Sequence, residues 1–436
     1  MPLDNLISAE DTAASPDTSL RGRLFQTRRL SMQIAELLSE EEQIVQAMDD
    51  ASPTKWHLAH TTWFFEEFVL KPHDRDYRIF DERFSYCFNS YYETVGPRQP
   101  RPKRSLLTRP SNAEVMAYRA HVDEALDRFF GRNSNEPPTD ALELIELGIN
   151  HEQQHQELML TDCLAAFAGN PLRPAYREPD SDAPDEAVKA APLSWVSFDG
   201  GIFQAGHEGN GFSYDNENPR HDQLIRPFRL ADRLVTNGEW LQFMADKGYE
   251  TSTLWLSDGW ATVQSEGWNA PLYWEKRDGS WYQMGLRGLL PVDPARPVCH
   301  VSYYEADAFA RWAGKRLPTE FEWEIASAGV ALEGNLLQSG ALQPQPARGD
   351  AGGLKQMIGD VWEWTGSAYL SYPGYKPPAG AVGEYNGKFM CNQFVLKGAS
   401  CVTPPGHIRR SYRNFFYPHQ RWQFTGLRLA DDGGAA

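Results

Sequence analysis

The first 170 residues alternate apolar and polar positions with the period of an α-helix. Apolar residues recur three and four positions apart, which places them on one face of a helix. The pattern predicts four helices, over residues 20–48, 52–68, 113–130 and 140–167. Four long amphipathic helices in this order predict a four-helix bundle.

Local signals mark two of the helix starts. Ser52 is the predicted N-cap of the second helix, with Pro53 at its first helical position. Asp140, with Glu143 three residues later, predicts a capping arrangement for the fourth helix, and Gly169 marks its end. Residues 71–110 form a long irregular connection between the second and third helices, and a loop of that length is usually functional.

The second half of the chain differs from the first in composition and in the periodicity of its apolar residues. Residues 177–192 are acidic, contain prolines and lack periodicity, which predicts a linker. Beyond them, short apolar runs such as Trp195–Phe198 alternate with Gly, Asn and Asp turns, and only residues 237–246 and 304–313 have a helical pattern. A helical domain over residues 18–176 is therefore expected to precede an irregular, loop-rich α+β domain over residues 193–431.

Composition excludes several classes of protein. A chain of 436 residues with 41% hydrophobic and 23% charged residues is typical of a globular protein with two or three domains. Its net charge of −17 repels phosphate backbones and argues against a nucleic-acid partner. No apolar run reaches the roughly 18 residues that a membrane span needs. Residues 1–17 carry no signal-peptide pattern and are expected to be a disordered lead-in.

The cysteines give no sign of a disulfide or zinc-thiolate framework. There are five, an odd number, widely spread and without a CxxC pair: Cys87, Cys163, Cys299, Cys391 and Cys401. This usage indicates reduced thiols in a cytoplasmic protein.

The segment HEQQH in the fourth predicted helix is the strongest chemical signal. His151 and His155 are four residues apart, so both imidazoles can reach one metal ion from the same helical face. They lie close to the line of Leu144, Leu147 and Leu158, which points into the bundle. Two histidines on a buried face are costly unless their nitrogens find partners.

Several interpretations of this segment compete. The histidines could be core residues bonded to polar neighbours, or the HExxH string could be a zinc-protease motif with Glu152 as general base. A third ligand is offered by WHLAHTTWFFEEF in the second helix, where His60 has aromatic neighbours within one turn and His57 is a competitor. A ligand upstream on another bundle helix is not the zinc-protease arrangement.

Taken together, these segments resemble the ergothioneine-biosynthesis sulfoxide synthases. The matching segments are WHLAHTTWFFEEF, HEQQHQELML, RLPTEFEWE, GDVWEW, KGAS and GLR. The resemblance implies a DinB-like helical bundle (residues 18–176) fused through the linker to a domain similar to the formylglycine-generating enzyme, a C-type-lectin-like fold (residues 193–431). Those enzymes need a cysteine pair after the KGGS-like element, whereas residues 401–413 contain only Cys401, which argues against a copper-thiolate oxidase.

The resemblance also implies an iron(II) centre and a reaction. His60, His151 and His155 are the implied Fe(II) ligands, and His57 then takes a structural or outer role. Neutral imidazoles suit Fe(II), and three protein ligands leave positions for substrates and O2. The implied reaction uses O2 to join the sulfur of a thiol to C2 of the imidazole of Nα-trimethylhistidine (hercynine), giving a sulfoxide.

Other positions are implied to bind the substrates. Gln154 and Tyr385 are expected to hydrogen-bond the substrate imidazole. The segment after Arg413 is expected to face the trimethylammonium group, which aromatic rings attract, and the basic loop at residues 96–104 is expected to bind the carboxylate of the thiol. The implied contacts are Asn414, Phe415 and Phe416 for the first group, and Arg98, Arg101 and, more weakly, Arg104 for the second.

A tyrosine pair is the implied catalytic element. Some family members carry a catalytic tyrosine three residues before the position of Tyr385, but here that position is Val382. Another branch resembles this chain in having a pair at Tyr91 and Tyr92, from which one tyrosine would supply a proton or hydrogen atom. That branch is associated with free cysteine as co-substrate, and the other branch with γ-glutamylcysteine.

Three alternatives stay open at the level of sequence. A selenoneine synthase would use the same scaffold with a selenium donor, whereas an ovothiol synthase would be expected to carry a methyltransferase-like segment after residue 430. A DinB-type thiol transferase or hydrolase would use zinc or nickel and consume no O2. A lectin-like binding module without catalysis would hold no tightly bound redox metal.

Overall fold

The computed structural model describes residues 17–131, 137–179, 190–349 and 353–432. The chain divides into a helical unit, Met1–Arg177 with Gly380–Glu384, and a second unit, Glu178–Ala379 with Tyr385–Ala436. The predicted lead-in falls outside the described residues except for Asp17, and so do residues 180–189 of the predicted linker. The expected domain limits stay predictions.

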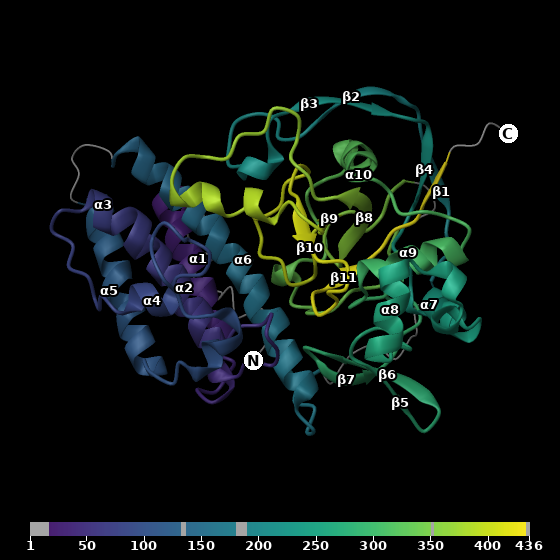
Figure 1. Ribbon diagram of the computed structural model, residues 1–436, viewed down its shortest axis with the longest axis horizontal. Helices are drawn as coiled ribbons and strands as arrows, with labels where there is room; N and C mark the ends of the chain where they lie inside the picture. The colour runs from purple at the N-terminus through teal and green to yellow at the C-terminus, as the bar shows by residue number, and fades with distance from the viewer. Residues whose placement is uncertain (1–16, 132–136, 180–189, 350–352, 433–436) are drawn as a thin grey trace. The chain divides into compact units, whose positions relative to one another are not determined.

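The helical unit contains the four long helices that the periodicity predicts (Figure 1). They are α1 (Leu20–Ala35), α2 (Thr54–Phe65), α5 (Asn112–Gly131) and α6 (Thr139–Gly169). Helix α6 packs against α1 and α2, and α2 also packs against α5. The predicted four-helix bundle is confirmed. Helix α2 continues into a short π-helix (Glu66–Leu70), and the connection after it contains α3 (Lys71–His73), α4 (Phe84–Phe88) and a 3-10 helix (Arg101–Leu106).

The predicted start signals of α2 and α6 are wrong. Pro53 and Pro138 occupy the N-cap positions, and neither helix has a side-chain cap. Ser52 is engaged elsewhere, because its hydroxyl accepts a hydrogen bond from Arg104 and its backbone N–H donates to Asp162. Asp140 accepts only from the N–H of the next residue.

The first helix is also shorter than predicted. It ends at Ala35 instead of near residue 48, and only a 3-10 turn (Glu42–Ile44) follows before α2. Ser39 and Glu42 bond reciprocally, each side chain accepting from the other's backbone N–H. This arrangement starts a new turn and breaks the earlier helix.

Helix α2 is the core of the helical unit, since all twelve of its residues are buried. Its neighbour α6 approaches closely because Gly148 has no side chain: a Cβ atom there would lie 2.4 Å from Cε1 of Phe65. Gly148 precedes His151 by three residues, so this close contact lies one turn from the histidines of α6. Helix packing therefore brings the two histidine-bearing segments together.

The second unit has the predicted α+β character, with four small sheets among the described residues (Figure 1). Their strand orders are β1–β4–β12, β10–β9–β8–β11, β2–β3 and β5–β6–β7. The strands are β1 (Trp195–Phe198), β2 (Gly201–Ala205), β3 (His221–Ile225), β4 (Phe228–Ala231), β5 (Trp274–Arg277), β6 (Ser280–Gly285), β7 (Gly288–Pro291), β8 (Trp362–Ala368), β9 (Phe394–Lys397), β10 (Asn414–Phe416), β11 (Thr425–Gly426) and β12 (Ala430–Asp432). All pairs are antiparallel except β8 with β11.

Two of the four helices of the second unit were predicted. Helices α7 (Asn237–Ala245) and α9 (Tyr303–Trp312) match the expected ranges, and each begins with a capping box. Helices α8 (Ser257–Glu266) and α10 (Glu320–Ala326) were missed. The first contains a glycine and several weak helix formers, and the second has only seven residues, too few to show a period.

The motifs of the second half are joined by buried ion pairs. RLPTEFEWE supplies the carboxylates of Glu320 and Glu324, and GDVWEW supplies that of Glu363. Each faces a buried cation from a later segment, in the pairs Glu320–Arg413, Glu324–Lys397 and Glu363–Arg428. Since a buried charge without its partner is strongly destabilising, loss of one partner of any of these pairs should destabilise the second unit.

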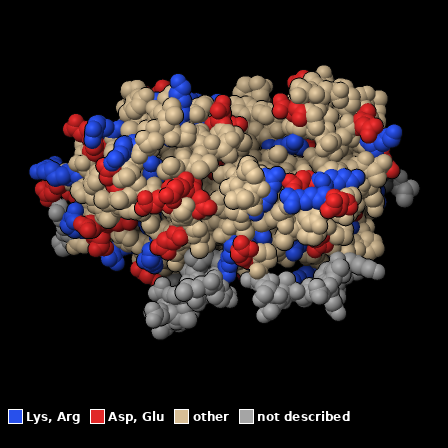
Figure 2. Space-filling model, turned by 90° about the horizontal axis from the view of Figure 1, so that it is seen from below, with Lys and Arg blue, Asp and Glu red and all other residues tan. Residues whose placement is uncertain are grey.

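The surface carries mixed charge. On the face shown in Figure 2, Lys and Arg side chains are interspersed with Asp and Glu, and no single basic area dominates that face. Within the described part of the chain, no helix has the length and apolar character needed to cross a membrane.

Candidate metal centre

Three histidines meet between α2 and α6. His60 comes from α2, His151 and His155 come from α6, and one ring nitrogen of each lies within 4.8 Å of the others. Nε2 of His60 is 3.2 Å from Nε2 of His151. Two nitrogens bound to one metal ion at about 2.1 Å are themselves about 3 Å apart. The cluster therefore has the spacing of a metal site, and its ligand role stays a prediction.

The hydrogen bonds around the cluster decide which nitrogens face the centre. Nδ1 of His60 lies 2.6 Å from the carbonyl oxygen of Phe88, which can only accept, so this nitrogen carries the proton. Nδ1 of His155 is engaged 2.8 Å from Nδ1 of His57. In both ligand candidates Nε2 is left to offer its lone pair to a metal ion.

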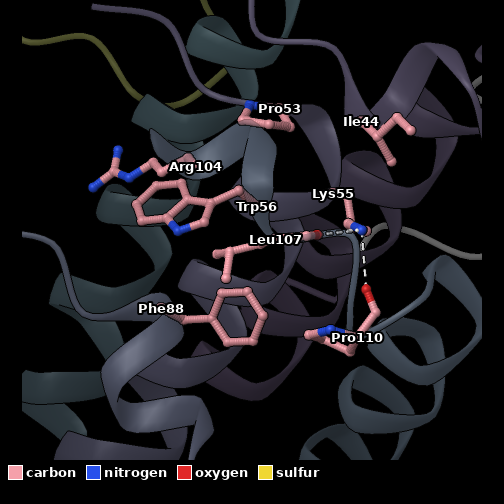
Figure 3. A pocket seen from close by; sticks show the side chains of 8 residues that line it. All are labelled: Ile44, Pro53, Lys55, Trp56, Phe88, Arg104, Leu107 and Pro110. Atoms are coloured by element: carbon pink, nitrogen blue, oxygen red, sulfur yellow. Dashed lines mark hydrogen bonds between the residues drawn. The ribbon is translucent and has the colours of Figure 1, made fainter. Parts of the chain in front are cut away.

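Aromatic rings hold His60 in position. Its ring stacks on Trp56, with centroids 4.6 Å apart and planes 12° apart, and lies 5.6 Å from Trp63. These three residues are spaced i, i+4, i+7 on α2 and so share one helical face. On the far side of Trp56 lies the guanidinium of Arg104, 3.3 Å from the indole centroid (Figure 3).

The histidines are neutral near pH 7. Burial, reinforced by neighbouring imidazoles, holds the pKa values of His60 and His155 well below the usual range. Burial lowers the pKa of His151 to about 4, although Glu152 opposes the shift. Because only the neutral imidazole offers a lone pair, the site is prepared for a cation without proton competition.

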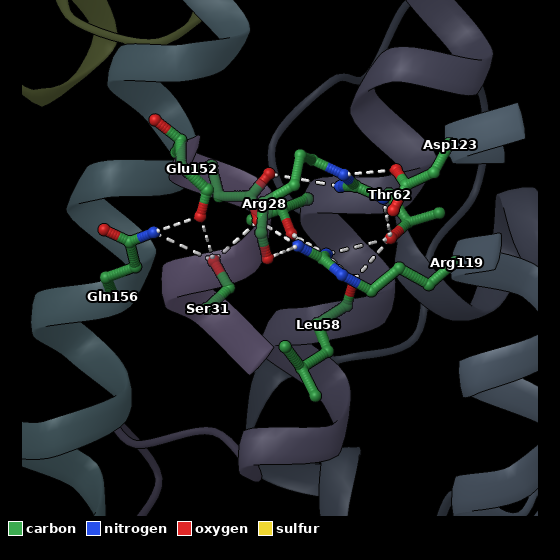
Figure 4. A network of polar contacts seen from close by, with 10 residues as sticks. Arg28, Ser31, Leu58, Thr62, Arg119, Asp123, Glu152 and Gln156 are labelled. Atoms are coloured by element: carbon green, nitrogen blue, oxygen red, sulfur yellow. Dashed lines mark hydrogen bonds and ion pairs between the residues drawn. The ribbon is translucent and has the colours of Figure 1, made fainter. Parts of the chain in front are cut away.

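Glu152 faces away from the histidine cluster. Its carboxylate accepts hydrogen bonds from Ser31 at 2.6 Å, from Arg28 at 3.1 Å and from Arg119 (Figure 4). Burial alone would raise the pKa of Glu152, but Arg119 and Arg28 outweigh it and lower the pKa to about 2. A carboxylate held between two arginines cannot serve as a general base at the metal, which argues against the zinc-protease interpretation.

The predicted tyrosine pair lies on the loop after α4. Tyr92 is buried, and its ring lies 5.7 Å from Trp63, the indole beside His60. The hydroxyl of Tyr91 accepts a hydrogen bond from Arg101 at 2.8 Å. Burial opposes ionisation of Tyr91, yet Arg101 and Arg104 outweigh it and lower its pKa, whereas burial raises the pKa of Tyr92. The two phenols therefore differ in acidity.

The three predicted carboxylate-binding arginines have different environments. Arg98 pairs with Glu93, and both Arg98 and Arg101 are partly exposed. Arg104 is buried and donates to the hydroxyls of Ser52 and Ser90, and burial with nearby Arg101 lowers its pKa to about 9. Arg98 and Arg101 thus reach solvent, whereas Arg104 is held in the interior beside Trp56.

Predicted substrate residues of the second unit form an aromatic cluster. Phe415 on β10 stacks on Tyr369 with centroids 4.1 Å apart, and Tyr385 lies 6.3 Å from Phe415. Phe416 instead lies against Trp422, since successive side chains of a strand point to opposite faces. The structure thus groups Tyr385 with Phe415. Asn414 precedes them on β10, and Gln154 is partly exposed on α6 of the helical unit.

Sequence reasoning missed several residues around these sites. Asp162 lies seven residues after His155, a spacing that returns to the same face of α6, and it bonds His57 at 3.0 Å. That spacing is the one signal that could have found it. Tyr369 and Phe389, the other rings of the aromatic cluster, come from separate loops and carry no such signal.

Comparison with known proteins matches both units. Residues 23–159 match the DinB superfamily, and residues 181–349 and 338–433 match the sulfatase-modifying factor enzyme 1-like domain. The fold and its site thus define a DinB-type helical unit joined to a sulfatase-modifying-factor-like domain.

Relatives with both parts show the family. The chain is 34% identical to the hercynine oxygenase of Mycolicibacterium smegmatis, over 87% of this chain and 91% of that protein. It is 36% identical to that of Mycobacterium tuberculosis, over 65% of this chain and 70% of that protein. A formylglycine-generating enzyme of Streptomyces coelicolor is 29% identical over 54% of this chain and 88% of its own length. The chain belongs to the hercynine oxygenase family.

Replacing Glu152 by Gln should destabilise the helical unit without removing the histidine cluster. The substitution removes the carboxylate partner of buried Arg119 and leaves Arg28 with Asp123 alone, and breaking a buried ion pair costs about 3–5 kcal/mol. Denaturant unfolding followed by circular dichroism measures the loss, and Co(II) titration checks the cluster. A stability equal to that of the unsubstituted protein would contradict the charge balance described for Glu152.

The metal-free protein should lose stability as the pH falls from 6.5 to about 4. His57, His60, His151 and His155 all have lowered pKa values, so the unfolded chain takes up protons that the folded chain does not. For His151, whose pKa in the folded protein is about 4, the loss at pH 5.5 should be about 1 kcal/mol. Denaturant unfolding in the presence of a chelator at pH 7.5 and 5.5 measures how the free energy of unfolding changes with pH. The His155→Asn variant should show a smaller change. A free energy of unfolding that is the same at both pH values would contradict the neutral state of the histidines.

Proposed function

We propose that this protein is a non-haem iron(II), O2-dependent sulfoxide synthase of ergothioneine biosynthesis. It joins the sulfur of cysteine or γ-glutamylcysteine to C2 of the hercynine imidazole. Thiol, hercynine and O2 give the sulfoxide and water, so that one C–S and one S–O bond form while the S–H and C–H hydrogens leave in water. The observation that carries the proposal is the His60–His151–His155 cluster in a chain of the hercynine oxygenase family.

The donor set supports iron as the metal. His60, His151 and His155 would hold it through Nε2, as the partners of Nδ1 in His60 and His155 require. Bound iron(II) with three imidazole ligands supplies positions for O2 and thiol and lowers the pKa of the thiol. The relatives' names support the pathway, since one further match is an ergothioneine biosynthesis protein of Schizosaccharomyces pombe, 28% identical over 50% of this chain and 27% of that protein.

Tyr91 is the better proton donor of the tyrosine pair. The Arg101 guanidinium bonded to its hydroxyl stabilises the phenolate that remains after a proton leaves, and its pKa is lowered accordingly. Tyr92 is buried against Trp63 and Phe68, and its raised pKa keeps it protonated. Tyr92 therefore fixes the loop while Tyr91 holds and releases the proton at Oη.

The remaining assignments concern substrate binding. In the helical unit, Gln154 bonds the imidazole, and Arg98 and Arg101 bind the carboxylate of the thiol. In the second unit, Tyr385 serves the imidazole and Phe415 serves the trimethylammonium group, whereas Asn414 and Phe416 lie on the opposite face of β10. Phe415 stacks on Tyr369 and has Tyr385 and Phe389 beside it, so that several aromatic rings are grouped where a cation could be attracted.

The function is tested by mass spectrometry of aerobic reactions with iron(II)-loaded protein and hercynine. Parallel reactions contain cysteine, γ-glutamylcysteine or a selenosugar. We expect a product with the mass of hercynine plus thiol plus one oxygen minus two hydrogens. The His60→Ala variant should form no such product. The control is His121→Ala, which should still form it, because His121 lies on α5 and bonds the Arg78 carbonyl. Product in the selenium reaction alone would reassign the donor, and no O2 consumption by the loaded protein would contradict a synthase.

Tyr91→Phe should lower the rate of sulfoxide formation about 100-fold, because a positioned general acid contributes on that order. Thiol oxidation without coupling to hercynine should take its place. Tyr92→Phe is the matched control and should retain most of the activity. Equal losses in both variants, or a loss in Tyr92→Phe alone, would contradict the assignment of Tyr91.

A further inference from the structure

A chain of hydrogen bonds leads from the histidine cluster to a buried carboxylate. Nδ1 of His155 lies 2.8 Å from Nδ1 of His57, and Nε2 of His57 lies 3.0 Å from Oδ2 of Asp162. The side chains of His57 and Asp162 are only 3% and 6% exposed. All three residues belong to α2 and α6, the helices that carry the cluster.

The direction of each hydrogen bond in this chain is fixed by chemistry. The Asp162 carboxylate can only accept, so Nε2 of His57 carries the proton. A neutral His57 then has its lone pair on Nδ1 and accepts from Nδ1–H of His155. His155 is thereby left with its lone pair on Nε2, the nitrogen that faces His60 and His151.

We propose that His57 and Asp162 are positioning residues that fix the tautomer and ring orientation of His155 and make its Nε2 a stronger metal ligand. This inference rests on the metal centre of the proposed function. A carboxylate that backs an imidazole raises the electron density at the opposite nitrogen and restrains the ring. Neither residue touches the metal or a substrate, and both act through His155.

The Nδ1 atoms of the three histidines have different hydrogen-bond partners, and His155 differs most from the other two. His60 donates to the neutral carbonyl of Phe88. Nδ1 of His151 is buried and has no hydrogen-bond partner among the described residues. Within the described chain, His155 is thus the one member of the cluster whose hydrogen bonds lead to an anion, and it should respond most to loss of the outer residues.

Asp162 also links the two helices. The same oxygen that accepts from His57 accepts the backbone N–H of Ser52 at 2.8 Å, just before α2 begins. One carboxylate of α6 therefore restrains both the start of the helix that carries His60 and the imidazole that supports His155. Asp162 therefore acts on both the start of α2 and the tautomer of His155.

The test is Co(II) binding to the metal-free full-length protein, measured by chelator competition and by the visible spectrum. His57→Leu should weaken binding about 10–100-fold and alter the Co(II) bands. His57→Gln should restore affinity to within a few-fold, because its amide can accept from His155 and donate to Asp162. Asp162→Asn, with a weaker neutral acceptor, should fall between the two.

Asp123→Asn is the matched control. Asp123 bonds Arg28 in the same helical unit and has no contact with the histidine chain, so its loss should leave Co(II) affinity and spectrum unchanged even if stability falls. Equal affinity in the unsubstituted protein, His57→Leu and Asp162→Asn would overturn the inference, as would equal losses in His57→Leu and His57→Gln. Failure of the unsubstituted protein to bind Co(II) would instead contradict the metal centre itself, and the inference with it.

Discussion

The burial of imidazole nitrogens between α2 and α6 is the constraint on which the helical unit depends. Polar ring atoms taken out of water must find partners, and His57, His60 and His155 meet this requirement with a carbonyl, with each other and with Asp162. The pKa values respond to the same burial, which keeps the rings neutral. A site that excludes protons and presents Nε2 lone pairs is the state that a divalent transition-metal cation requires.

Two carboxylates near the histidine cluster have different electrostatic roles. Glu152 directly follows His151 in sequence, yet it turns toward Arg28 and Arg119 and balances their charge inside the bundle. The carboxylate that does support the cluster is Asp162, which lies two turns after His155 on α6. In HEQQH the histidines and the glutamate thus serve different sides of one helix, and the string alone does not reveal the function.

Much of this organisation could be predicted from the sequence, because the helical period and the spacing of His151 and His155 are local properties. The segment WHLAH narrowed the third ligand to two histidines, and packing brings His60 rather than His57 into the cluster. The errors have tertiary causes: Ser52 does not cap α2 because Asp162 and Arg104 engage its polar groups. The contact of Tyr385 with Phe415 joins a loop to strand β10, a pairing that no local pattern encodes.

In the second unit, the family motifs supply the carboxylates of buried ion pairs, and the residues proposed to bind substrate lie on β10 and on the segment before β9. Glu320, Glu324 and Glu363 neutralise buried cations, whereas Tyr385 and Phe415 belong to an aromatic cluster outside those pairs. X-ray absorption at the iron edge of anaerobic, iron(II)-loaded protein is the most direct test of metal binding by His60, His151 and His155. The account predicts a first shell with three imidazole nitrogens that falls to two in His60→Ala and stays at three in His121→Ala. An imidazole number that does not change in His60→Ala, or a cysteine sulfur in the shell of the substrate-free protein, would contradict it.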